Sequence, residues 1–527
     1  MATSNSDHLF QLIKSLSKAE KRNFKVYTGR LSGNDGKLFV VLFDVLDKSN
    51  EYKESNVLKK LSAIKKDDVN LKGINKQRLT NLKRHLYSQI LKSLRLLHSQ
   101  KDIDVHIREL IDSSSILYAK GLYLQALKIL DKAKTVAQKA NQDFLMMEIF
   151  EHEKQIESRH ITRSRKVENK IENLIKESRR VNKVINSSSE LLNLNLKIHG
   201  LYIKIGFVKN AKDAFFVRSY FYSNLPNYKL YKITFFERVY LLQSFVWYHY
   251  TCLNFPRAYH NAYKWVNLFR SKEYMIEKDP DLYMRGLHYL LLTCFYMRYY
   301  DQFEEYFEVF KKFYNERKTS FNKTSELVYL IYGYNATLNK HFLAGTFTKA
   351  KKLLPEMEKQ LLGFDKIIDH HRKIMFSYKV AWLYFALSDY ASSLEQLNNI
   401  HNLKKNYLRN DIECYTKLFI LICNIELKEY LLVSNLISGT QRFFKKKDES
   451  NPAISLVFDY LRKRLLLRNE LPAKELIDLY DKLMLHRADK FTQRAFFYFN
   501  FTAWIKSKFE KESISQIRNN HFKNYRR

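Results

Sequence analysis

The amino-acid sequence predicts an all-α protein in which helix pairs stack into a solenoid behind an N-terminal helical cap. Glycine and proline are scarce, at 12 and 6 of 527 residues, whereas β-sheet proteins need many such residues in their turns. Hydrophobic residues make up 46% of the chain, including 37 Phe and 36 Tyr, which is ample material for a large core. A pattern that recurs about every 42 residues indicates that the helices form repeats.

The glycine-rich segment GRLSGNDGKLF (29–39) invites comparison with the phosphate-binding loop of nucleotide hydrolases. That loop requires a glycine where this chain has Leu31 and a hydroxyl where it has Leu38, so both ends of the pattern fail. Ser17 and Glu20 have the spacing of a capping box, which opens a helix before the glycines. The segment is therefore interpreted as the turn of a helical hairpin, and no nucleotide hydrolysis is expected.

Residues 1–100 are predicted to form a basic N-terminal helical cap that ends in an amphipathic helix over 75–98. The apolar face of that helix carries Leu79, Leu82, Leu86, Ile90, Leu94 and Leu97. The polar side carries candidate polyanion-binding residues, namely Arg78, Arg84, Lys92 and Arg95. Such a stripe presents cations about one turn apart, which suits contact with successive phosphates. An ordinary solvated helix face explains the same residues equally well.

Residues 101–200 are predicted to hold one repeat unit followed by long, charged helices. The unit contains ILYAKGLYLQALKILDKAKTVA (116–137), with Gly121 and Tyr123 at the turn and Ala126 and Ala133 where the helices cross. This stretch resembles the tetratricopeptide repeat, and the resemblance implies a pair of antiparallel helices. The opening SLSKAEKRNFK, followed by a helical-repeat body, is also similar to uncharacterised tetratricopeptide-type proteins of Bacteroidota. That similarity implies no activity.

Residues 201–527 are predicted to be a helical-repeat array with a basic C-terminal tail. The pattern of a turn aromatic followed by a small residue places equivalent close-packed positions at Ala262, Tyr306, Ala350, Ser393 and Val433. These positions are separated by 44, 44, 43 and 40 residues, and Lys474 extends the series by 41. Loop-forming sequences fall between them. Each unit would bury its apolar face against its neighbours, giving one continuous core.

The chain carries a net charge of +36, and the excess is concentrated at its two ends. Residues 1–100 and 401–527 each contribute +11. A second set of candidate polyanion-binding residues lies in the C-terminal part, at Lys445, Lys446, Lys447, Arg462, Lys463 and Arg464. A strongly basic surface favours a polyanionic partner, although lysine enrichment in an AT-rich genome is the alternative explanation.

No catalytic, metal-binding or cofactor-binding motif accompanies this charge. The 16 histidines include no H-E-x-x-H pair, and the 4 cysteines show no C-x-x-C spacing, which predicts buried, reduced thiols. No secretory signal or sufficiently long apolar run is present, which predicts a cytoplasmic protein without transmembrane segments. We therefore expect no enzymatic activity, no metal and no cofactor.

The sequence favours a binding protein whose basic surface engages a polyanion, with structured RNA or the ribosome ahead of DNA. The alternative is a protein–protein scaffold or regulator that takes a peptide or helix in the solenoid groove, with the positive charge selecting acidic partners. A third interpretation places the chain on anionic lipid through RAFFYFNFTAWIKSKF (494–509). That segment is better explained as a closing repeat helix.

Overall fold

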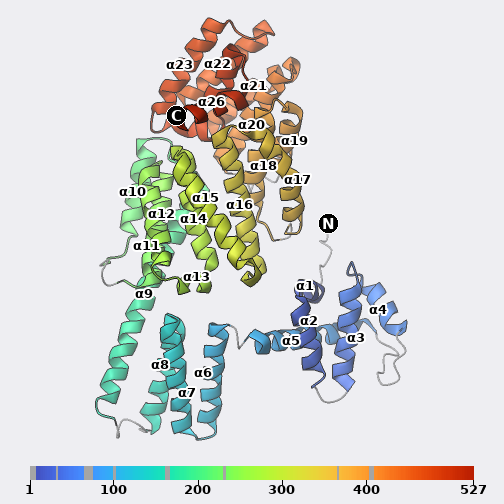
Figure 1. The fold of residues 1–527 in the computed structure, drawn as a ribbon, viewed down its shortest axis with the longest axis vertical. Helices are drawn as coiled ribbons and strands as arrows, with labels where there is room; N and C mark the ends of the chain where they lie inside the picture. Colours follow the sequence, from blue (N-terminus) through green and yellow to red (C-terminus); the bar gives the residue numbers. More distant parts are fainter. Residues whose placement is uncertain are drawn as a thin grey trace. The chain divides into compact units, whose positions relative to one another are not determined.

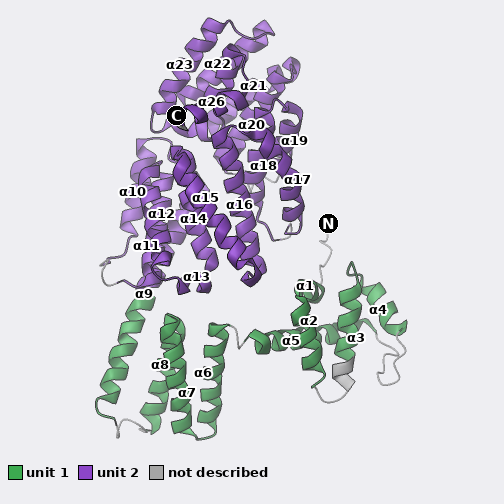
Figure 2. Ribbon diagram, viewed as in Figure 1, with its two compact units in different colours: residues 1–185 green, residues 186–527 purple. Residues whose placement is uncertain are grey.

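The computed structural model describes residues 8–30, 34–63, 75–98, 102–160, 167–228, 233–364, 367–402 and 409–526. Within these ranges the chain forms helices and loops and no β-strand, so the predicted all-α class is confirmed. Helices pack mainly against their neighbours in sequence, in the manner of a solenoid (Figure 1). The chain divides into two compact units, residues 1–185 and 186–527 (Figure 2). The division falls inside a long helix, α9 (Lys170–Ile205).

The first five helices of unit 1 share one apolar core. They are α1 (His8–Ser15), α2 (Lys18–Thr28), α3 (Asn34–Lys48), α4 (Glu54–Ala63) and α5 (Lys76–His98). The predicted capping box opens α2: the Ser17 N–H donates to Glu20 at 2.7 Å and the Glu20 N–H donates to the Ser17 hydroxyl at 3.3 Å. Gly29 caps the end of α2 in a right-handed conformation, and Gly33 lies outside the described residues.

The remaining helices of unit 1 are α6 (Ile103–Ala119), α7 (Tyr123–Lys139), α8 (Asp143–His160) and the first part of α9. The predicted helix pair is α6 and α7, joined at Gly121, whose φ of +75° suits a residue without a side chain. Ala126 and Ala133 are fully buried. The Ser114 hydroxyl donates to the Ala126 carbonyl at 3.1 Å, which shows how closely the two helices approach.

Unit 2 consists mainly of helix pairs that follow the end of α9 and α10 (Ala211–Ser223), with the short α13 (Tyr274–Lys278) between the first and second pairs. The first helices of the pairs are α11 (Phe235–Thr251), α14 (Pro280–Met297), α16 (Lys323–Ala344), α18 (His370–Ala386), α20 (Asn410–Glu426) and α22 (Pro452–Leu467). The second helices are α12 (Phe255–Arg270), α15 (Tyr300–Arg317), α17 (Phe347–Leu362), α19 (Tyr390–His401), α21 (Tyr430–Lys446) and α23 (Ala473–Ala488).

The close-packed positions predicted for the array are buried in five of six cases. Ala262, Tyr306, Ala350, Ser393 and Val433 are each at most 4% exposed. Lys474 is exposed, and the first buried residue of its helix is Leu476. The register shifts there because Pro472 caps α23, so that the helix begins only at Ala473.

The C-terminal segment folds back over earlier helices of unit 2. It contains the 3₁₀ turn Thr492–Arg494, α24 (Ala495–Tyr498), α25 (Phe501–Glu510) and α26 (Ile514–Arg526). Helix α25 packs against α23, and α26 packs against α16. Phe499, Phe501 and Trp504 are buried, which accounts for the aromatic content of residues 494–509 as a closing helix and its core. In the described part of the chain, no helix combines the length and apolar character that crossing a bilayer requires.

Candidate functional site

The cations predicted on α5 lie at the surface of unit 1. Arg78, Arg84 and Lys92 are exposed, and Arg95 pairs with Asp112 at 2.5 Å. The polar side of this helix is less uniform than the sequence suggested, because it also exposes Tyr87, Leu91 and Leu96. Three of the four predicted residues therefore remain available to a partner.

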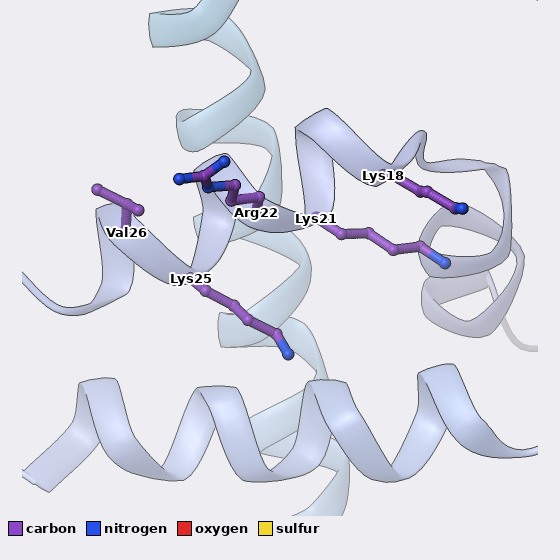
Figure 3. A pocket seen from close by; sticks show the side chains of 5 residues that line it. All are labelled: Lys18, Lys21, Arg22, Lys25 and Val26. Carbon is purple, nitrogen blue, oxygen red and sulfur yellow. The ribbon is translucent and has the colours of Figure 1, made fainter.

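Helix α2 adds a further group of cations to unit 1 that the sequence analysis did not single out. Lys18, Lys21, Arg22 and Lys25 surround an open hollow of about 470 Å³ together with Val26 (Figure 3). Salt bridges to two α3 carboxylates engage Lys21, at 2.6 Å, and Lys25, at 2.7 Å. Because the hollow is shallow and half of its charges are compensated, it offers a surface contact more than an enclosed site.

The predicted C-terminal cations differ in exposure and in their partners. Lys445 and Lys446 are exposed, whereas the other members have partners within the chain. These contacts are Lys447 to Asn410 at 2.9 Å, Arg462 to Asp459 at 3.0 Å and Lys463 to Glu475 at 2.8 Å. Arg464 is only 6% exposed and pairs with Glu470 at 2.7 Å, so its role is structural.

Unit 2 contains a groove of about 1220 Å³, lined mainly by the first helices of the pairs and by the C-terminal segment. We call it the unit 2 groove. Eight basic residues line it, namely Arg285, Arg298, Arg372, Lys373, Lys379, Arg409, Arg487 and Arg518. Among the described lining residues the carboxylates are Glu358 and Asp369. The groove is therefore strongly cationic.

Lys379 of α18 is a half-buried cation in this groove. Its ammonium donates to the side-chain oxygens of Asn335 and Asn339, the latter at 2.5 Å, and lies 5.6 Å from the ring centre of Phe295. No ion pair to Lys379 occurs within the described ranges. Burial lowers the pKa of Lys379 to about 7. The lysine is thus held by neutral groups, and its charge is left uncompensated.

Arg285 and His288 lie one turn apart on α14 and face the same region. The His288 ring stacks on Tyr332 of α16, with ring centres 4.1 Å apart and planes 10° apart. Burial, together with the nearby positive charges of Lys379, Arg372 and Arg285, lowers the pKa of His288 to about 3. Hence His288 is neutral at physiological pH. The Arg285 side chain is exposed to the groove and forms no carboxylate ion pair among the described residues.

Three hydrogen-bond donors in the groove wall are buried and unpartnered within the described structure. They are Asn195 Nδ2 of α9, Gln243 Nε2 of α11 and the Tyr378 hydroxyl of α18. Gln243 is only 4% exposed and Tyr378 only 8%. Buried polar groups in native proteins are normally hydrogen-bonded, so unpartnered donors facing a groove indicate a place for an acceptor.

A second pair of arginines lies where α26 meets the ends of α14 and α16. Arg518 donates to the Phe342 carbonyl at 3.1 and 3.2 Å. Burial, together with the charge of Arg298, lowers the pKa of Arg518 to about 10. Arg518 helps to hold α26, because the Phe342 main-chain carbonyl accepts from it.

Other cations around the groove are engaged in buried ion pairs. Arg409 binds the Asp411 carboxylate through two hydrogen bonds of 3.0 Å, and Arg494 pairs with Glu449. The Arg409 guanidinium also lies over the Tyr202 ring, 4.7 Å from its centre. The Arg494 pair fastens the C-terminal segment to the loop before α22. Arg285 and Lys379 form no carboxylate ion pair within the described residues, although the charge of Asp279 acts on Arg285.

Sequence reasoning missed the groove because its residues are separated by more than 300 positions. The local signal was nevertheless present. Polar residues recur at helical spacing within otherwise apolar helices, as with Arg285 and His288 or with Asn335 and Asn339. Such residues lie on one face of a helix, and a solenoid brings those faces together.

The described residues contain no group of His, Cys, Asp or Glu side chains arranged to hold a metal ion. Burial raises the pKa of Cys252 to about 11 and of Cys294 to about 12, so these thiols stay protonated. No protein-family model, curated protein or solved structure matches the chain.

Proposed function

We propose that the protein is a non-enzymatic, cytoplasmic binding protein built from tetratricopeptide-like helix pairs, and that it engages RNA. The observation that carries this proposal is the composition of the unit 2 groove, where eight Lys and Arg side chains face two carboxylates. Like charges gathered in a concave surface repel one another, and an anionic ligand relieves that repulsion. A structured RNA or a ribonucleoprotein such as the ribosome supplies the required charge density.

The size and the aromatic content of the groove favour a segment of a macromolecule. Its volume of about 1220 Å³ exceeds the roughly 300–1,000 Å³ typical of small-molecule sites. Half-buried rings in its wall include Trp247, Phe376 and Trp382. Grooves that combine cations with accessible rings bind single-stranded nucleic acid, because phosphates meet the charges and bases stack on the rings. Single-stranded loops of a structured RNA fit this description.

The exposed cations of unit 1 add sequence-independent attraction. Arg78, Arg84 and Lys92 have no carboxylate partner among the described residues and can each contact a phosphate. Such contacts strengthen binding at low salt and position the nucleic acid without reading its sequence. In this account unit 1 supplies affinity, and the groove supplies the contacts to bases.

A second candidate occupant of the same groove is an acidic peptide. The observation that favours it is the pair of unpartnered amides, Asn195 Nδ2 and Gln243 Nε2, which could donate to the carbonyls of an extended chain. The cations would then select acidic side chains. RNA is preferred because the groove presents many rings, which a peptide of this composition does not need.

The test measures the affinity of the full chain for a short single-stranded RNA at several salt concentrations. The double variant Arg285→Gln/Lys379→Met should bind more weakly, and its log–log salt slope should flatten by roughly 1.4, at about 0.7 per lost contact. The control is Lys445→Gln/Lys446→Gln, which removes the same charge at an exposed site. Equal losses of RNA affinity in both variants would show that binding depends only on the total charge of the protein. Unchanged RNA binding, with loss of binding to an acidic peptide, would favour the second candidate.

A further inference from the structure

We propose that Arg285 and Lys379, with the amide of Gln243 in the wall of the same groove, form a pocket within the unit 2 groove that binds the phosphate group of a ligand. This inference rests on the proposed function in placing an RNA phosphate there. The same pocket would also accept a free phosphorylated compound. We call it the phosphate pocket.

The first argument is the surplus of donors in this part of the groove. Gln243 Nε2 is buried and has no acceptor within the described structure, and Asn195 Nδ2 on the neighbouring helix is in the same condition. A buried donor without an acceptor costs about 1–3 kcal/mol, so such donors are retained where a ligand completes them. The oxygens of a phosphate can accept several hydrogen bonds at once.

The second argument is the way Lys379 is held. Asn335 and Asn339 of α16 accept from its ammonium, which fixes the side chain and uses two of its three N–H bonds. The third N–H is left for another acceptor. Two amide oxygens position the lysine without neutralising it, as a site for an external anion requires.

The third argument is that Arg285 and Lys379 both lie near the His288 ring. The charges of Arg285, Lys379 and Arg372 all act on His288, so they lie close to one ring. Arg372 pairs with Asp369 at 3.2 Å, whereas Arg285 has no carboxylate partner in the described part of the chain. A guanidinium can donate two parallel hydrogen bonds to a phosphate. Arg285 therefore supplies the directional contact and Lys379 the point charge.

The surroundings of Lys379 predict that binding takes up a proton. The charged and titratable groups around this region are His199 on α9, Arg285, His288 and Tyr289 on α14, Tyr332 on α16, and His371 and Arg372 on α18, with Asp279, Asp369, Arg409 and Asp411 nearby. Burial places the pKa of Lys379 at about 7, so a large fraction of the free protein has a neutral lysine above that pH. A bound dianion favours the ammonium form and raises this pKa.

The experiment titrates the full chain with inorganic pyrophosphate by calorimetry near pH 8, in two buffers of different ionisation enthalpy. We expect saturable binding with net proton uptake. Arg285→Gln and Lys379→Met should each weaken it by about tenfold or more, as loss of a hydrogen bond to a charged group predicts. The proton uptake should disappear in Lys379→Met. Arg285→Lys keeps the positive charge and should bind pyrophosphate more tightly than Arg285→Gln does.

The matched control is Arg257→Gln, which removes an exposed arginine of α12 that does not line the groove. It should bind pyrophosphate almost as the wild type does. The pocket is refuted if the wild type does not bind, or if Arg257→Gln weakens binding as much as Arg285→Gln. A parallel titration with single-stranded RNA separates the two proposals. If the protein binds RNA but not pyrophosphate, the phosphate pocket is refuted and the proposed RNA-binding function is supported. If it binds pyrophosphate but not RNA, the phosphate pocket is supported, its ligand is a free phosphorylated compound, and the proposed function is refuted.

Discussion

At the scale of single residues, Gly345 shows how one missing side chain allows a distant segment to dock. Gly345 ends α16 with a φ of +68°, and a Cβ atom there would collide with the backbone of α26 at Ser515, Arg518 and Asn519. The Ser515 hydroxyl donates to the Gly345 carbonyl at 2.6 Å. The glycine therefore serves both the turn and the close approach of two backbones.

We predict that Gly345→Ala releases α26 from α16. The control is Gly121→Ala, which has the same backbone requirement at a φ of +75° but no neighbouring atom within 4 Å of the added Cβ. Both variants should bear the strain of a left-handed alanine, roughly 1–2 kcal/mol. Only Gly345→Ala should accelerate hydrogen exchange across residues 514–526. Equal exchange in the two variants would show that the contact does not hold the helix.

The buried imidazole of His288 makes a pH-dependent contribution to stability. Its pKa is about 3 in the folded chain against an ordinary value of 6.5, so between these limits the unfolded chain binds a proton that the folded chain does not. Stability must fall as the pH is lowered from 6.5 towards 3. His288→Phe keeps a ring against Tyr332 and removes this titration. The drop in thermal midpoint from pH 7 to pH 4.5 should therefore be smaller in the variant, and an unchanged drop would contradict the assignment.

At the scale of helices, the sequence predicted those features that depend on local spacing. The capping box of Ser17 and Glu20, the apolar face of α5 and the crossing residue Ala126 are all found where expected. Each follows from contacts within one helix or between neighbours. The burial of Arg464 was missed, although it lies three residues after the buried Leu461 on the same face of α22. The sequence of basic residues at 462–464 was interpreted as exposed charge, and the helical spacing that buries Arg464 was overlooked.

The candidate site itself was not predicted, for a physical reason. Arg285, Asn335 and Lys379 belong to different repeats, and only the stacking of the first helices brings them to one groove. The return of the C-terminal segment was equally invisible, because α26 docks on α16 through side chain to main-chain hydrogen bonds such as Asn519 to Ala344 at 2.9 Å. Such contacts leave little trace in a sequence pattern.

Helix crossings provide a direct test of the repeat register. Ala126 and Ala350 are fully buried, so replacing either with Leu should overpack the contact at a cost of about 1–3 kcal/mol. Ala473→Leu makes the same chemical change at an exposed position and should leave the thermal midpoint nearly unaltered. If both buried variants have the thermal midpoint of the parent, the crossings tolerate larger side chains and the register is misplaced.

At the scale of the whole molecule, the charge of +36 has two distinct uses in this account. Exposed cations such as Arg84 and Lys92 attract a polyanion from any direction, an effect that salt screens. Groove cations such as Arg285 and Lys379 are confined within unit 2 and can act only on a ligand that enters it. Surface charge alone would give binding without a preferred site. In the proposed function, the groove provides the preferred site.

The most direct measurement of this claim is a map of photo-cross-links between the full chain and a bound single-stranded RNA. The account predicts cross-links concentrated in peptides from α11, α14, α16 and α18, with Trp247 and Trp382 as the expected aromatic contacts, and their loss in Arg285→Gln/Lys379→Met. Cross-links confined to the exposed cations of unit 1, unchanged in that double variant, would contradict the groove as the RNA site.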